Sequence, residues 1–426
     1  MDPEVLQTLV LVVTIAALSP FISDLAKKWL RLPGVVIEIL LGIVIGPHVL
    51  GWAQLNEIIS VLAELGLVFL IFLAGFEIDL QQVKGRPVKL AVTGWLVSLV
   101  LGTAVAVALY SLGVTVSIRF VAIALTTTAI GTLLPILGDA GILPTRFGTY
   151  VLAGGAMGEL GPIVAISIAL TSDAPGRTAF VIAGFGAVAV IAAIIATRPA
   201  PPRAVRLITT TLHSSAQLGV RLAVLLCVLL VWIASRFDLD VLLGAFAAGM
   251  IARIFLVSQS EAVIGGLDDT GIGRSVDQSE FSKVNHRHEV QTRLESMGFG
   301  FFIPLFFVIS GVKFDLGALA HVGTLLKVPM FLVLFLVVRG LPALLYRHDL
   351  PSQSMRALGV LQSAGLPLLV VITGLGVESG QMRSDNAAAL VGAGLLSVII
   401  FPIVGLAMHA KAPAQADTPT VAPHHA

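Results

Sequence analysis

An acidic side chain in a glycine-rich, apolar stretch is the first group in this sequence whose setting suggests chemistry. Glu159 follows Gly154 and Gly158 and is followed by Gly161 and Pro162. Small neighbours let backbone from other segments approach the carboxylate, and a charge in an apolar stretch is costly enough to need a reason. We predict that Glu159 binds a cation and a proton in turn. A purely structural, hydrogen-bonded glutamate is the alternative.

Three consecutive threonines are a second source of ligands. Thr126, Thr127 and Thr128 carry hydroxyl oxygens, and unwound backbone there would add carbonyl oxygens, the atoms that hard cations prefer. Threonine also commonly hydrogen-bonds to its own helix, so a structural role is equally open for each of them. The sequence therefore offers Thr126, Thr127 and Thr128 as candidate oxygen ligands or supporting residues for a cation site at Glu159.

An arginine in an apolar block is the third such feature. Arg339 lies between Phe331 and Pro342, in a segment that is otherwise hydrophobic apart from Gly340. Arginine cannot lose its proton to escape burial, so it must find a carboxylate or the carbonyl end of a helix. We predict that Arg339 anchors the site. Direct competition with the bound cation is the alternative.

The composition indicates which elements must position these groups. Of the 426 residues, 57% are hydrophobic and 12% are charged, and the mean hydropathy is +0.98. Soluble domains carry about 25% charged residues. Apolar blocks recur at about 17 to 25 residues, the length of a membrane-spanning helix, without the alternation of a β-barrel strand. We predict an all-α polytopic membrane protein with about 13 transmembrane helices.

Charge and cysteine usage exclude further classes. The net charge of +1 and the lack of a sustained basic run argue against a nucleic-acid partner. The single cysteine, Cys227, excludes an intrachain disulfide and a cysteine-based zinc site. The first residues lack the basic region of a cleaved signal peptide, so the first block is expected to be a retained span. Lys and Arg concentrate in alternate loops, which predicts an outside N-terminus and a cytoplasmic C-terminus in the cell membrane.

Two of the predicted spans are interrupted. The fifth, at 117–137, contains the threonines and Pro135, and the twelfth, at 355–377, contains Gly365 and Pro367. Proline removes a backbone donor and clashes with the preceding turn. Broken helices at matching positions of inverted repeats point to a transporter's binding site, and a separation of seven spans gives the two halves opposite orientations. Two kinked helices in an inert bundle are the alternative.

This pairing predicts the organisation of the chain. A long polar loop at 257–295 is expected to be solvated, with a pH-sensing role for its His286 and His288 as the alternative. The predicted parts are a first inverted repeat of six spans at 1–176, a linker helix at 177–205, a second repeat at 206–410 that includes a cytoplasmic loop at 257–295, and a disordered tail at 411–426.

Four motifs resemble a known family. They lie at residues 33–47 in the second span, 69–80 in the third, 126–148 around the threonines and 301–316 in the tenth. In this order they resemble the monovalent cation:proton antiporter family, in the Kef/Nap-like branch of the sodium/hydrogen exchanger superfamily. The resemblance extends from about residue 5 to residue 408 and implies a fold of the Nha/Nap-like antiporter type.

The resemblance also implies roles for individual residues. It places the family's ion-binding carboxylate on Glu159, its threonine ligands on Thr127 and Thr128, and its basic residue on Arg339. The family usually has Asp at the position of Glu159, and Asp, Asn or Gln at the position of Gly158. A core domain of spans 4–6 and 11–13 is expected to move against a panel of spans 1–3 and 8–10, which usually forms a homodimer.

The leading hypothesis is a secondary active transporter that exchanges Na⁺ or K⁺ for H⁺ across the bilayer by alternating access, with a role in pH homeostasis. A single titrating carboxylate predicts electroneutral exchange. A sodium-coupled organic solute symporter and a ligand-gated potassium efflux channel or sensor are the alternatives. No cofactor is expected. An enzyme is not expected, and an intramembrane enzyme is the least favoured hypothesis, because the apolar blocks show no paired aspartates, histidine-rich metal site or serine–lysine dyad at helical spacing.

Overall fold

The computed structural model describes residues 3–26, 33–77, 85–170, 217–237, 239–265 and 290–412, with a few isolated positions between 184 and 194. Nine helices in these ranges are long and apolar enough to cross a membrane, and two shorter apolar helices accompany them. Every predicted span has a helical counterpart except the seventh, at 178–197, most of which lies outside the described residues. The prediction of a polytopic all-α protein is confirmed for the described part.

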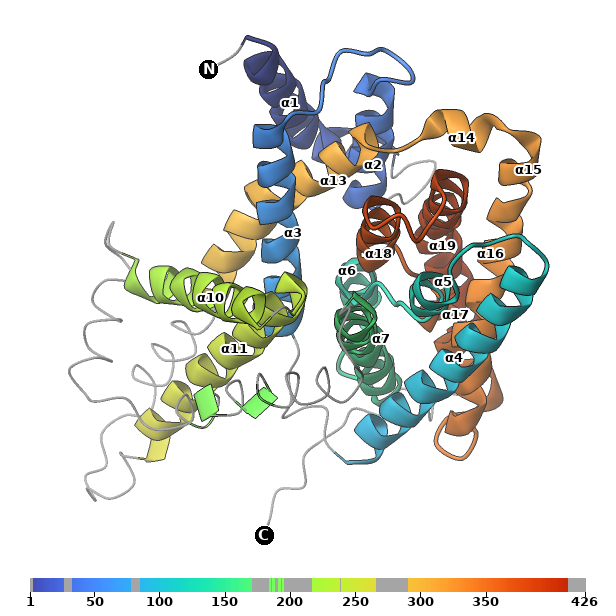
Figure 1. Ribbon diagram of the computed structural model, residues 1–426. Helices are drawn as coiled ribbons and strands as arrows, with labels where there is room; N and C mark the ends of the chain where they lie inside the picture. The colour runs from blue at the N-terminus through green and yellow to red at the C-terminus, as the bar shows by residue number, and fades with distance from the viewer. Residues whose placement is uncertain are drawn as a thin grey trace. The chain divides into compact units, whose positions relative to one another are not determined.

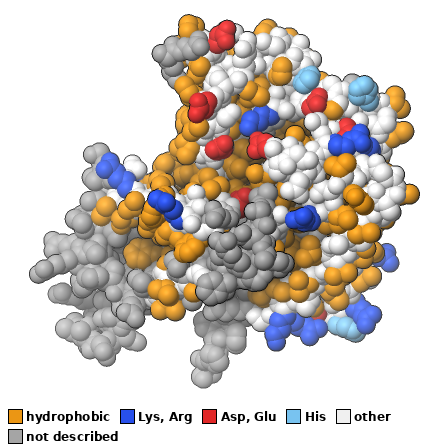
Figure 2. All heavy atoms as spheres, viewed as in Figure 1, with side chains coloured by type: hydrophobic (Ala, Val, Ile, Leu, Met, Phe, Trp, Pro, Cys, Tyr) orange, Lys and Arg blue, Asp and Glu red, His pale blue; other side chains and the backbone are white. Residues whose placement is uncertain are grey.

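The surface of the described helices is apolar. Phe21, Leu25, Val100 and Leu225 are 79%, 74%, 69% and 61% exposed. Figure 2 shows hydrophobic side chains over much of the described surface in view, with charged side chains sparse among them. Exposing so much apolar area to water is unfavourable, whereas lipid tails accept it without cost. The surface therefore fits a bilayer.

The chain divides into two compact units. Of the described residues, those within Met1–Ser60, Leu80–Ala169 and Phe307–Ala426 form unit 1, and the others form unit 2. The helices that lie wholly or mainly in unit 1 are α1 (Pro3–Ala26), α2 (Gly34–Ile45), α4 (Arg86–Ser111), α5 (Ile118–Ala124), α6 (Ile130–Asp139), α7 (Arg146–Leu170), α14 (Leu316–Ala320), α15 (Val322–Leu325), α16 (Lys327–Phe335), η3 (Leu336–Gly340), η4 (Leu341–Tyr346), α17 (Ser352–Gln362), α18 (Pro367–Glu378) and α19 (Ser384–His409).

Close backbone packing joins α2 to the part of α13 (Ile303–Val312) that belongs to unit 1. A Cβ on Gly42 would collide with the Val308 carbonyl oxygen, and a Cβ on Gly311 would collide with that of Ile39. Small residues at helix contacts let backbones approach closely in membrane proteins, where van der Waals packing replaces the hydrophobic effect as the driving force. The two glycines therefore fix this helix pair.

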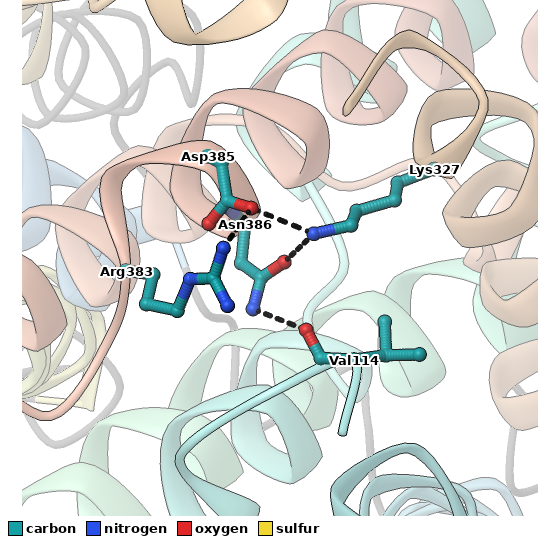
Figure 3. Close-up of polar contacts among 5 residues, drawn as sticks. All are labelled: Val114, Lys327, Arg383, Asp385 and Asn386. Carbon is teal, nitrogen blue, oxygen red and sulfur yellow. Dashed lines mark hydrogen bonds and ion pairs between the residues drawn. The ribbon is translucent and has the colours of Figure 1, made fainter. Parts of the chain in front are cut away.

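A polar network ties together three segments at one end of unit 1 (Figure 3). Lys327 Nζ donates to Asp385 Oδ2 at 2.8 Å and to Asn386 Oδ1 at 2.7 Å. The Asn386 amide donates to the carbonyl oxygen of Val114 at 2.9 Å, and Arg383 reaches the same Asp385 carboxylate oxygen at 2.9 Å. Asn386 is fully buried. The network connects the starts of α16 and α19 to the loop before α5.

A second network surrounds Asp349, in the turn between η4 and α17. Arg86 Nε and Nη2 donate to its two carboxylate oxygens at 2.6 and 2.9 Å, and the Tyr150 hydroxyl donates at 3.1 Å. The Asp349 side chain is only 5% exposed. Hydrogen bonds from the Arg86 guanidinium hold the pKa of Asp349 below its ordinary value of 3.8. The starts of α4 and α7 are thereby joined to this turn.

Unit 2 consists mainly of α3 (Glu57–Glu77), α10 (Leu218–Arg236), α11 (Val241–Gly265), residues 290–297 and η2 (Gly298–Phe302). Gly249 of α11 lies against the carbonyl of Phe72, and Gly75 lies against that of Phe246. The rings of Phe69 and Phe302 stack with centroids 5.1 Å apart. Small residues and stacked rings therefore hold α3 against α11 and η2.

The predicted loop at 257–295 is too long at both ends. Helix α11 continues to Gly265, and residues 290–297 are helical. Val290 and Leu294, four positions apart, are buried, which explains why the second stretch forms a helix. The rest of the loop, with His286 and His288, lies outside the described residues, as do almost all of the predicted linker at 177–205 and the tail beyond residue 412.

Candidate functional site

Two broken helices meet inside unit 1. Helix α5 ends at Ala124 and α6 begins at Ile130, while α17 ends at Gln362 and α18 begins at Pro367. Figure 1 shows α5, α6 and α7 among α16 to α19, and α5 packs against α18. Backbone that leaves a helix at membrane depth must find hydrogen-bond partners in the protein, so the bonds of the two breaks define the site.

Carbonyl groups at the second break accept hydrogen bonds from the first break. The Ala129 N–H donates to the Ala364 carbonyl at 2.7 Å, and the Thr128 hydroxyl donates to the Gln362 carbonyl at 2.6 Å. The Thr128 N–H donates to the Gly158 carbonyl of α7 at 3.0 Å. These bonds bring the threonines, the second break and the acidic segment of α7 together, as the interrupted spans predicted.

Glu159 lies in the middle of α7 and is 8% exposed. Its Oε1 accepts the backbone N–H of Ile130, the first residue of α6, at 3.1 Å. The first N–H groups of a helix have no partner within it and carry a partial positive charge. The carboxylate is therefore held at the start of a half-helix, where a negative charge is favoured.

Arg339 is 2% exposed and belongs to the π-helical turn η3. Its Nε and Nη2 donate to Thr128 Oγ1 at 2.9 and 2.7 Å. Nη1 donates to Ser98 Oγ at 3.3 Å, and Nη2 also reaches the Gly154 carbonyl at 3.1 Å. The guanidinium thus connects α4 and α7 to the break after α5. The sequence predicted an anchoring role, and these four bonds are consistent with one.

The neighbouring hydroxyls of the break have different partners. Thr126 Oγ1 donates to the Ile123 carbonyl at 2.8 Å, and Thr127 Oγ1 donates to the Ala124 carbonyl at 2.9 Å. A hydroxyl has one hydrogen and two lone pairs. Because the Thr127 hydroxyl donates its hydrogen to the Ala124 carbonyl, its oxygen can act only as an acceptor toward other groups. A cation ligand needs such an oxygen.

One face of α7 is lined by glycines, and neighbouring side chains fill the space above it. A Cβ on Gly158 would lie 2.5 Å from Thr128 Oγ1 and 2.7 Å from Arg339 Nη2. A Cβ on Gly154 would collide with the Gln362 amide. The glycines that mark Glu159 in the sequence therefore make room for the arginine and the crossing segments.

Of the two prolines predicted to mark breaks, Pro367 adjoins its break and Pro135 does not. Pro135 lies inside α6, several residues after the break at 125–129, while Pro367 begins α18. Proline suits the first position of a helix because its missing N–H would have no partner there. Gly365 lies in the second break and donates its N–H to Ser397 Oγ at 3.1 Å. The first break can precede Pro135 because Gly158 and Ala364 satisfy its N–H groups.

Sequence reasoning missed several contributors. Ser98 of α4 accepts a hydrogen bond from Arg339, and Ser397 of α19 accepts one from the Gly365 N–H in the second break. A signal for Ser98 was present, because Gly94, Ser98 and Gly102 form a row of small residues at a spacing of four, a pattern typical of close helix contacts. In the structure, a Cβ on Gly102 would lie 2.9 Å from the Ala122 carbonyl of α5.

A family comparison agrees with this architecture. The family described as "Sodium/hydrogen exchanger, transmembrane" matches residues 12–264 and 280–408, which is most of the chain. The chain belongs to the sodium/hydrogen exchanger family. The family resemblance predicted from the motifs is confirmed.

Individual relatives of this exchanger-family chain are distant in sequence. It is 24% identical over 390 residues to the Na(+)/H(+)-K(+) antiporter GerN of Bacillus cereus, covering 89% of this chain and 90% of the relative. It is 23% identical over 414 residues to YjbQ of Bacillus subtilis, covering 93% of this chain but only 62% of that protein. The match to YjbQ is thus confined to part of its length.

A solved structure shares the fold of this family member. The sodium proton antiporter MjNhaP1 from Methanocaldococcus jannaschii superposes with a TM-score of 0.65 at 15% identity, covering 96% of this chain and 97% of that one. The prediction of an Nha-like fold is confirmed.

Proposed function

We propose that this chain exchanges a monovalent cation, Na⁺ or K⁺, for H⁺ by alternating access, as a transporter rather than an enzyme and without a cofactor. The observation that carries the proposal is the carboxylate of Glu159 at the point where two broken helices cross. The family membership supports it, as does the name of the Bacillus cereus relative, which mentions both cations.

In this proposal Glu159 binds either the cation or the proton, never both. Thr127 and backbone carbonyls of the break complete the cation's coordination, and Thr126 supports them. Thr128, Gly158 and Gly365 shape the crossing. Because Arg339 keeps its charge, one carboxylate titrates in each cycle, and exchange of one cation for one proton moves no net charge.

The proposed membrane topology and assembly are those expected from the amino-acid sequence. The protein spans the cell membrane with its N-terminus outside and its C-terminus in the cytoplasm. A core of spans 4–6 and 11–13 moves against a panel of spans 1–3 and 8–10, the panel joins two copies, and the exchange serves pH homeostasis. The proposed partners are the cation, the proton and the bilayer, and nucleic acid is not among them.

Purified protein in liposomes tests the proposed function. A pH-sensitive dye inside the vesicles reports proton flux when gradients of Na⁺, K⁺ and Li⁺ are imposed in turn. Proton flux driven by Na⁺ or K⁺ is expected from the wild-type chain and not from Glu159→Ala. Full flux from the variant would refute the role of Glu159, and a membrane potential generated by transport would refute electroneutral exchange.

A further inference from the structure

The oxygen of Thr128 has no lone pair left for a cation. Its hydrogen is donated to the Gln362 carbonyl at 2.6 Å, and its two lone pairs accept Arg339 Nε and Nη2 at 2.9 and 2.7 Å. These three bonds use the full capacity of a hydroxyl group. The residue is 1% exposed, so water does not compete for them. A cation bound to this oxygen would also lie beside a guanidinium that stays charged.

We propose that Thr128 is a positioning residue for Arg339, and that the side-chain ligands of the transported cation are Glu159 and Thr127. This inference rests on the proposed function and narrows the predicted ligand set. Thr128 holds the planar guanidinium through two bonds that converge on its single hydroxyl oxygen, and its own hydrogen bond to Gln362 fixes the hydroxyl between the two breaks. In this proposal Thr127 binds the cation, and Thr128 positions Arg339.

Gly158 makes this arrangement possible. A side chain at this position would need the space that Thr128 Oγ1 and Arg339 Nη2 fill, at 2.5 and 2.7 Å from its Cβ. Because Gly158 has no side chain, the guanidinium of Arg339 packs against α7 at this position, directly before Glu159 in the sequence. From there it reaches both Thr128 and the Gly154 carbonyl. A positive charge that moves toward the Glu159 carboxylate weakens cation binding to it by Coulomb repulsion.

The position of the guanidinium therefore influences the apparent cation affinity. Thr128→Val keeps the shape of the side chain but removes both acceptor sites for Arg339. The guanidinium is then free to approach Glu159, the residue after Gly158 in α7, and to compete with the cation for its carboxylate. We expect the cation concentration at half-maximal proton flux to rise roughly tenfold, the lower end for losing a charge-assisted hydrogen bond, with little change in maximal flux. Thr128→Ser keeps the hydroxyl and should retain the wild-type value.

A double-mutant cycle on the full-length chain in liposomes separates a positioning residue from a ligand. With Arg339→Gln, and with Arg339→Lys as a second variant that keeps the charge but not the paired bonds to Thr128, Thr128→Val should change the half-saturating concentration less than twofold. Thr127→Val is the matched control and should retain its effect in both arginine variants. An equal effect of Thr128→Val with and without Arg339 would overturn the inference, as would Thr128→Ser behaving like Thr128→Val.

Thermal unfolding in detergent provides the same cycle without transport. The losses in Tm caused by Thr128→Val and Arg339→Gln should be less than additive, because both remove one interaction. Additive losses would overturn the inference. If the wild-type chain shows no cation-dependent proton flux, the proposed function fails, and the unfolding cycle still decides whether Thr128 positions Arg339.

Discussion

The carboxylate of Glu159 accepts the backbone N–H of Ile130 at 3.1 Å, so the acid proposed to carry the proton also binds the first residue of half-helix α6. A charged carboxylate is stabilised at a helix N-terminus. In the proposed cycle, a proton or a cation that binds to Glu159 neutralises this charge and weakens the contact. Occupancy of the site is thereby connected directly to the position of a half-helix.

Glu159→Gln tests the carboxylate without removing its structural bond. The amide oxygen still accepts the Ile130 N–H, but the side chain no longer binds a proton or attracts a cation. We expect proton flux in liposomes to fall by roughly a hundredfold or more, with Tm in detergent close to that of the wild type. Flux near the wild-type rate would show that the proton travels by another group.

The close contact between α2 and α13 predicts the effect of a single added methyl group. Gly311→Ala pushes its Cβ against the Ile39 carbonyl, and overpacking of this kind costs about 1–3 kcal/mol. Gly374→Ala in α18 is the control, because no atom lies within 4 Å of its Cβ. Unfolding in detergent should show a lower Tm for the first variant and an unchanged or higher Tm for the second. Equal Tm values would contradict the packing seen here.

The network in Figure 3 predicts that Lys327 and Arg383, which both contact the Asp385 carboxylate, contribute unequally to stability. Lys327→Met leaves the buried amide oxygen of Asn386 without its lysine donor, and an unsatisfied buried acceptor costs about 1–3 kcal/mol. Arg383→Gln removes a side chain that is 55% exposed, so solvent compensates for most of the loss. The Tm should fall clearly in the first variant only. A similar decrease in both would show that burial does not decide the contribution.

Asp349 predicts a pH dependence of stability. Its pKa lies below 3.8 in the folded protein because Arg86 donates to both carboxylate oxygens. A group whose pKa is lowered on folding stabilises the protein fully above its ordinary pKa, and this contribution is lost as the pH falls through the lower, folded value. The Tm of the wild type should therefore exceed that of Asp349→Asn by a constant amount above about pH 5, and the gap should narrow as the pH falls below 3.8. A gap that persists in acid would point to packing rather than charge.

Much of the architecture was predictable because lipid imposes strong rules on sequence. Blocks of apolar residues of bilayer length mark the spans, and a charge inside one stands out, so Glu159 and Arg339 could be named before any contact was known. The threonine segment was also recognisable, because three consecutive hydroxyls interrupt an apolar span.

The exact position of the first break could not be predicted, because it depends on hydrogen bonds to residues far away in the sequence. The first break lies before Pro135 because the N–H groups of Thr128 and Ala129 bond to Gly158 and Ala364, and no local pattern near the break records those partners. The family resemblance implied that Thr128 is a cation ligand, whereas its hydrogen bonds support the proposed role of positioning Arg339. Its bonds to Arg339 became visible only once residues 211 positions apart were placed together.

The bonds between the two breaks also bear on how the chain is made. Thr128 and its partner Gln362 are separated by 234 positions, so the ribosome completes the first break long before the residues that satisfy it. At about 5–20 residues per second, this delay lasts roughly ten to fifty seconds. During synthesis the first half must wait at the translocon or in the bilayer with polar backbone exposed, and a chain that stops before Gln362 should be a target for membrane proteases.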